Sequence, residues 1–225
     1  MSLDFSPILE RWPMLLDGAV VTMKLATSAT ILGFIIGTLC AIGRNSKIEW
    51  LSNLCACYVE AVRNTPFLVQ VFLVFFGLSS LGLTMSAIAV SIIALTINVG
   101  AYTGEIMRAG INSVHAGQWE AAECLGLSKP QIYWHIVLRP AVERVYPSLT
   151  SQFVLLMLAS SITSQISVSD LTGNANFIQG ASFRPMETYL TIGGIYLLLA
   201  VTMRFVFWLI ALVAFPRRRR LGTAV

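Results

Sequence analysis

The sequence contains few charged residues. Lys, Arg, Asp and Glu make up 12% of its 225 residues, whereas hydrophobic residues make up 56% and the mean hydropathy is +0.75. Soluble domains carry about 25% charged residues, so this composition excludes a soluble enzyme. The hydrophobic residues are gathered in long runs that charged segments separate. This pattern predicts an all-α integral membrane protein built from spanning helices.

Residues that hold metals or form disulfides are also scarce, with four cysteines and two histidines. Three cysteines lie in or beside hydrophobic runs and the fourth is isolated, so we expect reduced thiols rather than a disulfide or zinc framework: Cys40, Cys55, Cys57 and Cys124. The chain also lacks the Gly-x-x-x-x-Gly-Lys-Ser/Thr phosphate loop. The sequence therefore predicts no catalytic residue, metal site or cofactor in this chain.

The hydrophobic runs predict a single transmembrane domain over residues 1–225. Five spans are expected, at about residues 14–42, 50–81, 86–107, 149–168 and 188–215. The second run is longer than the ~20 residues that one perpendicular helix needs, and Pro66 divides it. We therefore expect this span to be tilted or broken.

Basic residues near the span ends predict the orientation. One set of loops holds most of them: Arg44, Lys47, Arg108, Lys129, Arg139, Arg144 and the run at 217–220. The opposite set holds Arg11 and Arg184, with Lys24 at the edge of the first span. The N-terminus is therefore expected outside and the C-terminus in the cytoplasm. Membrane orientation also explains the net charge of +4 better than nucleic-acid binding does.

The longest predicted cytoplasmic feature is the segment 108–146. Residues 118–125 favour a short helix that Gly126 ends, and Pro130, Pro140 and Pro147 are expected to mark turns. Glu120 and Glu123 give this helix an acidic stripe, whereas helices that lie on lipid usually have basic polar faces. The helix is therefore expected to pack against a protein partner.

This segment resembles a known family. Glu120-Ala121-Ala122, followed by Gly126, Ile136 and Leu138, is similar to the EAA loop in membrane subunits of type I ABC importers. In that family the short helix sits in a cleft of the ATP-hydrolysing subunit. The resemblance assigns this coupling role to Gln118, Glu120, Ala121, Ala122 and Gly126. The chain departs from the pattern at Arg139, where the family has proline.

Two further stretches resemble the polar amino-acid permeases of that family. They are residues 58–70, with Asn64 in place of a glycine, and residues 101–110. The resemblance implies a bacterial inner-membrane subunit that imports a polar amino acid by alternating access. It also implies an ATP-binding subunit dimer that holds ATP and Mg, a second identical or related permease, and an external solute-binding protein. An opine or another small polar solute stays open as the substrate.

Charged residues inside the spans need partners or water. Glu60 with Arg63, and Glu105 with Arg108, are spaced to pair within their own helices. These residues are either charge-paired helix ends or a network that forms an inner gate. Arg204, about 16 Å from its helix end, is expected to face a neighbouring subunit or a wet cavity.

Uncharged polar residues are concentrated in the third and fourth spans. They either join helices or line the substrate pathway. The candidates for the pathway are Asn98, Tyr102, Ser160, Ser161, Ser164 and Gln165. In the resembling family the fourth span often reads Leu-Lys-Asp-Thr-Ser-Leu, whereas residues 158–162 carry no charge here. A substrate role that rests on those two charges therefore does not transfer to this chain.

Two other functions are weaker. A membrane-embedded enzyme would use His115 and His135 with Glu120 and Glu123, but the histidines lie 20 residues apart and give no paired ligand spacing. A passive channel would not need a long cytoplasmic segment with a partner helix.

Overall fold

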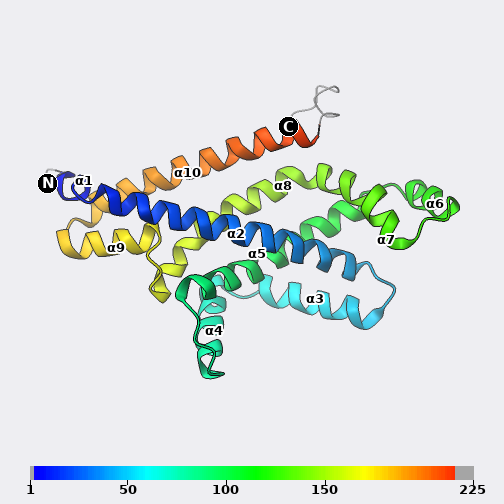
Figure 1. The fold of residues 1–225 in the computed structure, drawn as a ribbon, viewed down its shortest axis with the longest axis horizontal. Helices are drawn as coiled ribbons and strands as arrows, with labels where there is room; N and C mark the ends of the chain where they lie inside the picture. The colour runs from blue at the N-terminus through cyan, green and yellow to red at the C-terminus, as the bar shows by residue number, and fades with distance from the viewer. Residues whose placement is uncertain (1–2, 216–225) are drawn as a thin grey trace.

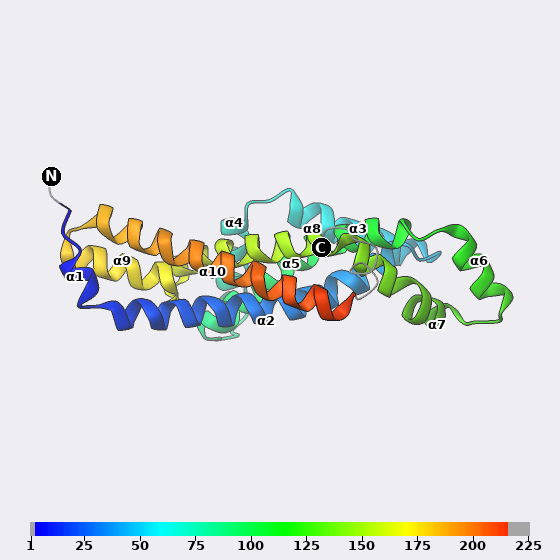
Figure 2. The ribbon, with the colours of Figure 1, turned by 90° about the horizontal axis from the view of Figure 1, so that it is seen from above.

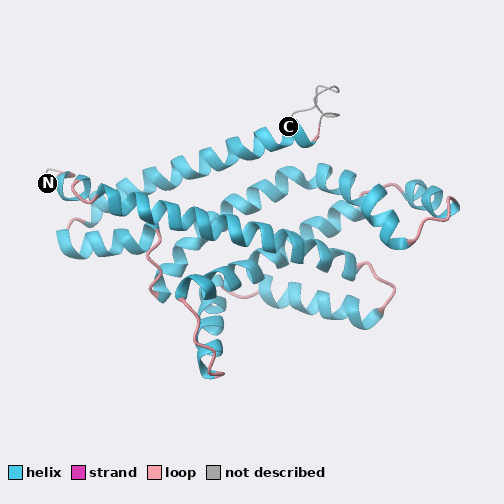
Figure 3. Ribbon diagram, viewed as in Figure 1, coloured by secondary structure: helices cyan, strands magenta, loops and turns pink. Residues whose placement is uncertain are grey.

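The computed structural model describes residues 3–215, and each regular element within them is a helix, as Figure 3 shows. The α-helices are α1 (Ser6–Leu9), α2 (Trp12–Arg44), α3 (Glu49–Arg63), α4 (Phe67–Ser80), α5 (Ala87–Asn112), α6 (Ala116–Cys124), α7 (Lys129–Gln131), α8 (Leu138–Ala159), α9 (Leu171–Ser182) and α10 (Pro185–Ala214). A π-helix, η1 (Ile132–Val137), precedes α8, and a 3₁₀-helix, η2 (Ser160–Ile166), follows it. The predicted all-α class is confirmed. The arginine run at 217–220 lies outside the described residues.

Four helical segments are long and apolar enough to cross a membrane: α2, α5, Lys129–Ile166 and α10. A fifth span results if α3 and α4 count as one broken span. These two helices are bent by 111° at the break that Pro66 introduces. Figure 1 shows α4 turned away from the long axis of the bundle. The expected break in the second span is confirmed, whereas the inside–outside orientation stays a prediction.

The expected loop at 108–146 is mostly helical, which corrects the prediction that Pro130, Pro140 and Pro147 mark turns. Pro130 lies in the first turn of α7 and Pro140 in the first turn of α8, where a missing N–H is tolerated. The π-helix η1 ends three residues before Pro140, and its bond from the N–H of Leu138 to the carbonyl of Tyr133 does not use the N–H that proline lacks. Pro147 lies inside α8. The helical segment that contains the predicted fourth span therefore begins well before residue 149.

Residues 169–187, between the fourth and fifth predicted spans, are expected as a loop because Gly173, Asn174, Asn176, Gly180 and Pro185 favour turns, but the structure forms α9 there. The carboxylate Oδ1 of Asp170 accepts the backbone N–H of Gly173 at 2.8 Å and so caps the helix. The helix ends at Phe183, which has a left-handed backbone conformation, and Pro185 begins α10. Four of the five turn-favouring residues therefore lie within a helix, and Asp170 and Phe183 cap it.

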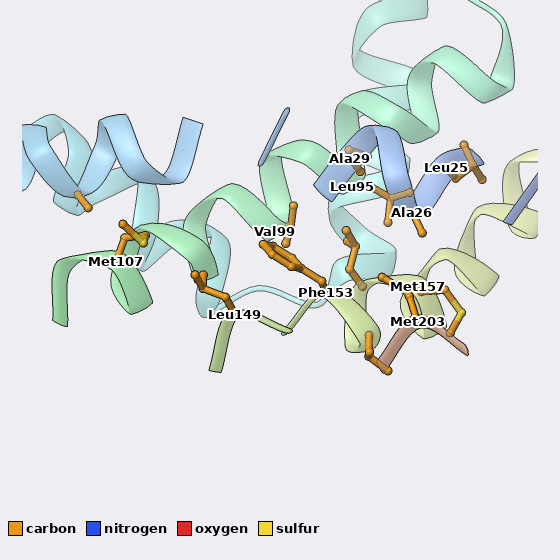
Figure 4. Packing of buried hydrophobic residues seen from close by; sticks show 14 of the residues in the cluster. Leu25, Ala26, Ala29, Leu95, Val99, Met107, Leu149, Phe153, Met157 and Met203 are labelled. Carbon is orange, nitrogen blue, oxygen red and sulfur yellow. The ribbon is translucent and has the colours of Figure 1, made fainter. Parts of the chain in front are cut away.

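The core is formed mainly by α2, α5 and α8, and α10 contributes Met203. Figure 4 shows Leu25, Ala29 and Val99 in the same cluster as Phe153 and Met157. A smaller core joins α9 to α2 and α10 through Leu15, Leu171, Ala175, Ile178 and Ile192. Figure 2 shows α1 and α9 at one end of the molecule and α6 at the other. The bundle therefore holds α6 far from the N-terminal end.

The closest approach within the bundle is between α2 and α5. Two glycines four residues apart on α2, Gly33 and Gly37, face α5, which carries the same spacing at Gly100 and Gly104. A Cβ on Gly37 would lie 2.7 Å from the carbonyl oxygen of Gly100. Paired Gly-x-x-x-Gly spacings let membrane helices approach at backbone distance. This pairing was readable from the sequence but is not among the sequence-based predictions.

Candidate coupling helix and polar pathway

The predicted partner helix is α6, and side-chain and backbone groups define both of its ends. His115 precedes the helix, and its imidazole Nδ1 accepts the backbone N–H of Gly117 at 3.1 Å. At the other end, the N–H of Leu127 bonds to the carbonyl of Ala122 at 3.2 Å, and that of Gly126 to the carbonyl of Glu123 at 2.9 Å. These two bonds form a Schellman motif.

The Schellman motif requires a left-handed residue at Gly126, whose φ is +74°. A side chain at this position would be strained although nothing lies within 4 Å of the place where its Cβ would be. The predicted glycine stop is therefore confirmed, and its cause is the backbone conformation rather than crowding.

One side of α6 anchors the helix and the other side is exposed. Ala122 is buried, and Trp119 packs edge-on against Tyr133 of η1 with ring centroids 5.1 Å apart. Gln118, Glu120 and Ala121 are exposed. Gln118, Ala121 and Ala122 line a cavity of about 770 Å³ between α6, η1 and the start of α8. The exposed side therefore combines an acidic group, a small residue and a hollow, and its coupling role stays a prediction.

The connection from α6 to the bundle is short on both sides. Three residues, 113–115, separate it from α5, and the guanidinium of Arg144 on α8 donates to the carbonyl of Ser113 at 2.6 Å. On α5, Gly110 lies against the carbonyl of Ala141 on α8. The base of α6 is therefore attached to both α5 and α8.

Glu105 is the centre of the charge network in the structure. Glu105 pairs with Arg108 on its own helix, as predicted, and it also accepts from Arg44 of α2 at 2.5 Å. The sequence analysis used Arg44 only to predict the orientation in the membrane. Residue spacing does not show that side chains on two separate helices meet. Glu105 thus joins α2 to α5 just beyond the Gly37–Gly104 crossing.

The expected pair between Glu60 and Arg63 is wrong. Glu60 instead accepts from the side-chain amide of Asn64 at 3.1 Å. Arg63 is the last residue of α3, and its guanidinium lies over the ring of Tyr102 on α5, 5.7 Å from the centroid. The face of the tyrosine ring attracts the guanidinium. Arg63 therefore has its partner on a neighbouring helix instead of on its own. Tyr102 therefore contacts Arg63, one of the four residues predicted for the charge network.

Among the predicted pathway residues, Asn98 has a partner that the sequence analysis missed. Its amide Nδ2 donates to Oε1 of Gln70 on α4 at 2.9 Å, in a buried position. The amide of Gln70 in turn donates to the carbonyl of Val62 at 2.7 Å and so ties the start of α4 to the end of α3. The sequence signal that could have indicated this contact is Gln70, the single glutamine in the apolar helix α4. This pair places neutral polar groups at the break between α3 and α4.

The polar residues of the fourth span lie in η2, which packs against α4 and α5. A 3₁₀-helix has three residues per turn, so Ser161 and Ser164 lie in one row. Ser160 is buried, whereas Gln165 is exposed. The three serine hydroxyls donate to carbonyls three residues earlier, at 2.7–2.8 Å, and not to other helices. These bonds disfavour a role in joining helices and leave the hydroxyl oxygens able to accept hydrogen bonds.

His115 and His135 do not come together with Glu120 and Glu123 as a metal site. Within residues 3–215, no group of three His, Cys, Asp or Glu side chains has an arrangement that could hold a metal ion. His115 caps α6 and His135 lies at the cavity beside it.

Comparisons with known proteins add independent information. A family model described as "Binding-protein-dependent transport system inner membrane component" matches residues 29–218. The chain is 34% identical over 205 residues to the nopaline transport system permease of Agrobacterium fabrum, with 87% of this chain and 85% of that protein covered. It is 38% identical over 173 residues to a probable glutamine ABC transporter permease of Bacillus subtilis, covering 77% of this chain and 79% of that protein.

Solved structures agree with these sequence matches. The crystal structure of an amino acid ABC transporter with histidines matches with a TM-score of 0.83 and 33% identity, over 93% of this chain and 98% of that one. An inward-facing methionine ABC transporter matches with a TM-score of 0.77 at 17% identity, a likeness of fold alone.

Proposed function

We propose that this chain, which belongs to the family of binding-protein-dependent permeases of ABC importers, moves a polar amino acid or a related opine across the membrane. It is a multi-pass protein of the inner membrane. The single observation that carries the proposal is α6, a short capped helix with an exposed acidic and small-residue side at the far end of the bundle. A channel or a purely structural membrane protein has no use for such a helix.

In this proposal, separate subunits supply the energy for transport. A dimer of ATP-binding subunits hydrolyses ATP with Mg and receives α6 in a cleft, so that Glu120 and Ala121 contact the partner. A second permease, identical or related, completes the pathway, and an external solute-binding protein delivers the substrate. Alternating access opens the pathway first outward and then inward.

The proposed substrate follows from the polar groups of the pathway and from the relatives. Neutral donors and acceptors at Gln70, Asn98, Ser161 and Ser164 can replace the water around an ammonium and a carboxylate without holding a full charge. The relatives include nopaline and octopine permeases as well as glutamine and arginine permeases. An opine carries the same ammonium and carboxylate chemistry, so it stays the second candidate.

The proposal is tested by reconstituting the permease with its ATP-binding subunits and its solute-binding protein in proteoliposomes. We expect ATP hydrolysis to rise when the binding protein carries its substrate, and uptake to require ATP. A panel of polar amino acids and opines then identifies the substrate by the stimulation that each produces. Uptake that continues at the same rate without ATP would instead indicate a channel and would overturn the proposal.

A further inference from the structure

A groove of about 1,450 Å³ lies on the side of α6 and η1 that faces α2. Its wall is formed by apolar residues of α2 (Phe34, Ile35, Leu39 and Ile42), and its far side by the start of α8. The volume exceeds the roughly 300–1,000 Å³ of small-molecule pockets. The groove is therefore larger than a polar amino acid requires, and its wall along α2 is mainly apolar.

The groove changes from apolar to basic along its length. Ile35 is seven residues before residue 42, the predicted end of the first span, and so lies about 10 Å inside the span at 1.5 Å per residue. Leu39, 63% exposed, continues this wall toward the helix end. Beyond the end of α2 the lining becomes basic, with Lys47 three residues after Arg44 and Lys129 at the start of α7, both exposed. The apolar part therefore lies at the depth of acyl chains and the basic part at the depth of headgroups.

The charge at this end is mostly positive and is not neutralised by near neighbours. Lys47, Lys129 and Arg139 line the groove against one acidic residue, Glu123. Within residues 3–215, neither lysine forms an ion pair. Trp134 also lines the groove, with 73% of its surface exposed. Tryptophan is enriched at the membrane–water interface, where its ring lies among headgroups.

We infer that this groove binds one anionic phospholipid, with an acyl chain along α2 and its headgroup phosphate between Lys47 and Lys129. A second copy of the chain is a poor occupant, because a two-fold contact would bring like charges together. The segment 217–220, which follows the groove residue Phe215 in the chain, is also a poor occupant. Its four arginines would be brought against the basic residues of the groove. A soluble partner does not reach the wall at Ile35, which lies inside the span.

The test measures lipid retention on the purified complex of permease and ATP-binding subunits by native mass spectrometry. Phosphatidylglycerol is compared with phosphatidylcholine of the same acyl chains. The test variant is Lys47→Gln with Lys129→Gln, and Lys24→Gln on α2, which lies outside the groove, is the matched control. The double change Lys47→Arg with Lys129→Arg keeps the charge.

The wild type, the Lys24→Gln control and the arginine variant are expected to retain one phosphatidylglycerol per permease that the double glutamine variant loses. The affinity of the permease for phosphatidylglycerol should fall roughly fivefold for each lysine removed. Equal retention of both lipids, or equal retention by the glutamine variant and the control, would overturn the inference. Loss of the second permease or of the ATP-binding subunits with lipid retention unchanged would show that the groove is a protein interface and would also overturn it.

Discussion

Replacing Gly37 by alanine should separate α2 from α5 and destabilise the protein. The new Cβ would lie 2.7 Å from the carbonyl oxygen of Gly100, 2.7 Å from Cβ of Thr103 and 2.8 Å from the backbone nitrogen of Gly104. Two of these three atoms belong to the backbone of α5, so no side-chain rotation relieves the contact. The helices must move apart instead.

The expected magnitude follows from two opposing effects. Overpacking a well-packed core costs about 1–3 kcal/mol. Alanine is a better helix former than glycine by roughly 0.5–1 kcal/mol, which offsets part of that cost. Because backbone atoms provide the contact, the overpacking cost should lie in the upper part of its range, about 2–3 kcal/mol, which leaves a net destabilisation of about 1–2.5 kcal/mol. The Arg44–Glu105 ion pair, two turns further along α2, should lengthen with the separation.

Thermal unfolding of the detergent-solubilised protein measures the effect. The matched control is Gly193→Ala on α10, where nothing lies within 4 Å of the added Cβ and only the gain in helix propensity remains. We expect a lower unfolding temperature for Gly37→Ala and an unchanged or higher one for Gly193→Ala. If Gly37→Ala unfolds at the temperature of the control or above it, close backbone contact between α2 and α5 at Gly37 does not limit the size of the residue there.

Three other changes have separate outcomes. Gly126→Asp should add roughly 1 kcal/mol or more of strain at φ +74° and, by misdirecting α6, lower copurification of the ATP-binding subunits while membrane insertion stays normal. Burial raises the pKa of Asp170 from 3.8 to about 7, so the folded state binds this proton more tightly than the unfolded state, and stability should fall as pH rises from about 4 to 7. A melting temperature equally pH-dependent in Asp170→Asn would contradict this assignment. Asn98→Leu leaves Oε1 of Gln70 without its donor, so it should cost about 1–3 kcal/mol and raise the KM for uptake. A stability loss with uptake constants unchanged would make Asn98 structural.

The membrane class, the long spans and the break at Pro66 were predictable from the sequence because each depends on local composition. Hydrophobic runs set span length, and proline removes a backbone donor wherever it stands. The stop at Gly126 belongs to the same group, since a left-handed residue after a helix is a local requirement. These features do not depend on which helices become neighbours.

The errors arose where local signals were ambiguous or where partners come from separate helices. Gly173, Asn174 and Gly180 favour turns, yet the structure places them within α9. The pairing of Arg44 with Glu105 spans 61 residues, and its geometry depends on the crossing of α2 and α5. The Gly-x-x-x-Gly spacing on both helices was the signal that could have predicted that crossing.

The attachment of α6 limits how a partner can act on the spans. Motion of α6 reaches α5 through three residues, and Arg144 ties that same connection to α8. At Gly110, α5 and α8 meet at backbone distance, so one cannot shift far without the other. On the opposite side, α5 is held to α2 by the glycine crossing and by Glu105. A push on α6 is therefore expected to rotate α5 and α8 together and to strain the Arg44–Glu105 pair first. This pair, like the hydrogen bond between Asn45 and Asn112, is a polar, breakable contact between the end of α2 and α5 rather than close backbone packing.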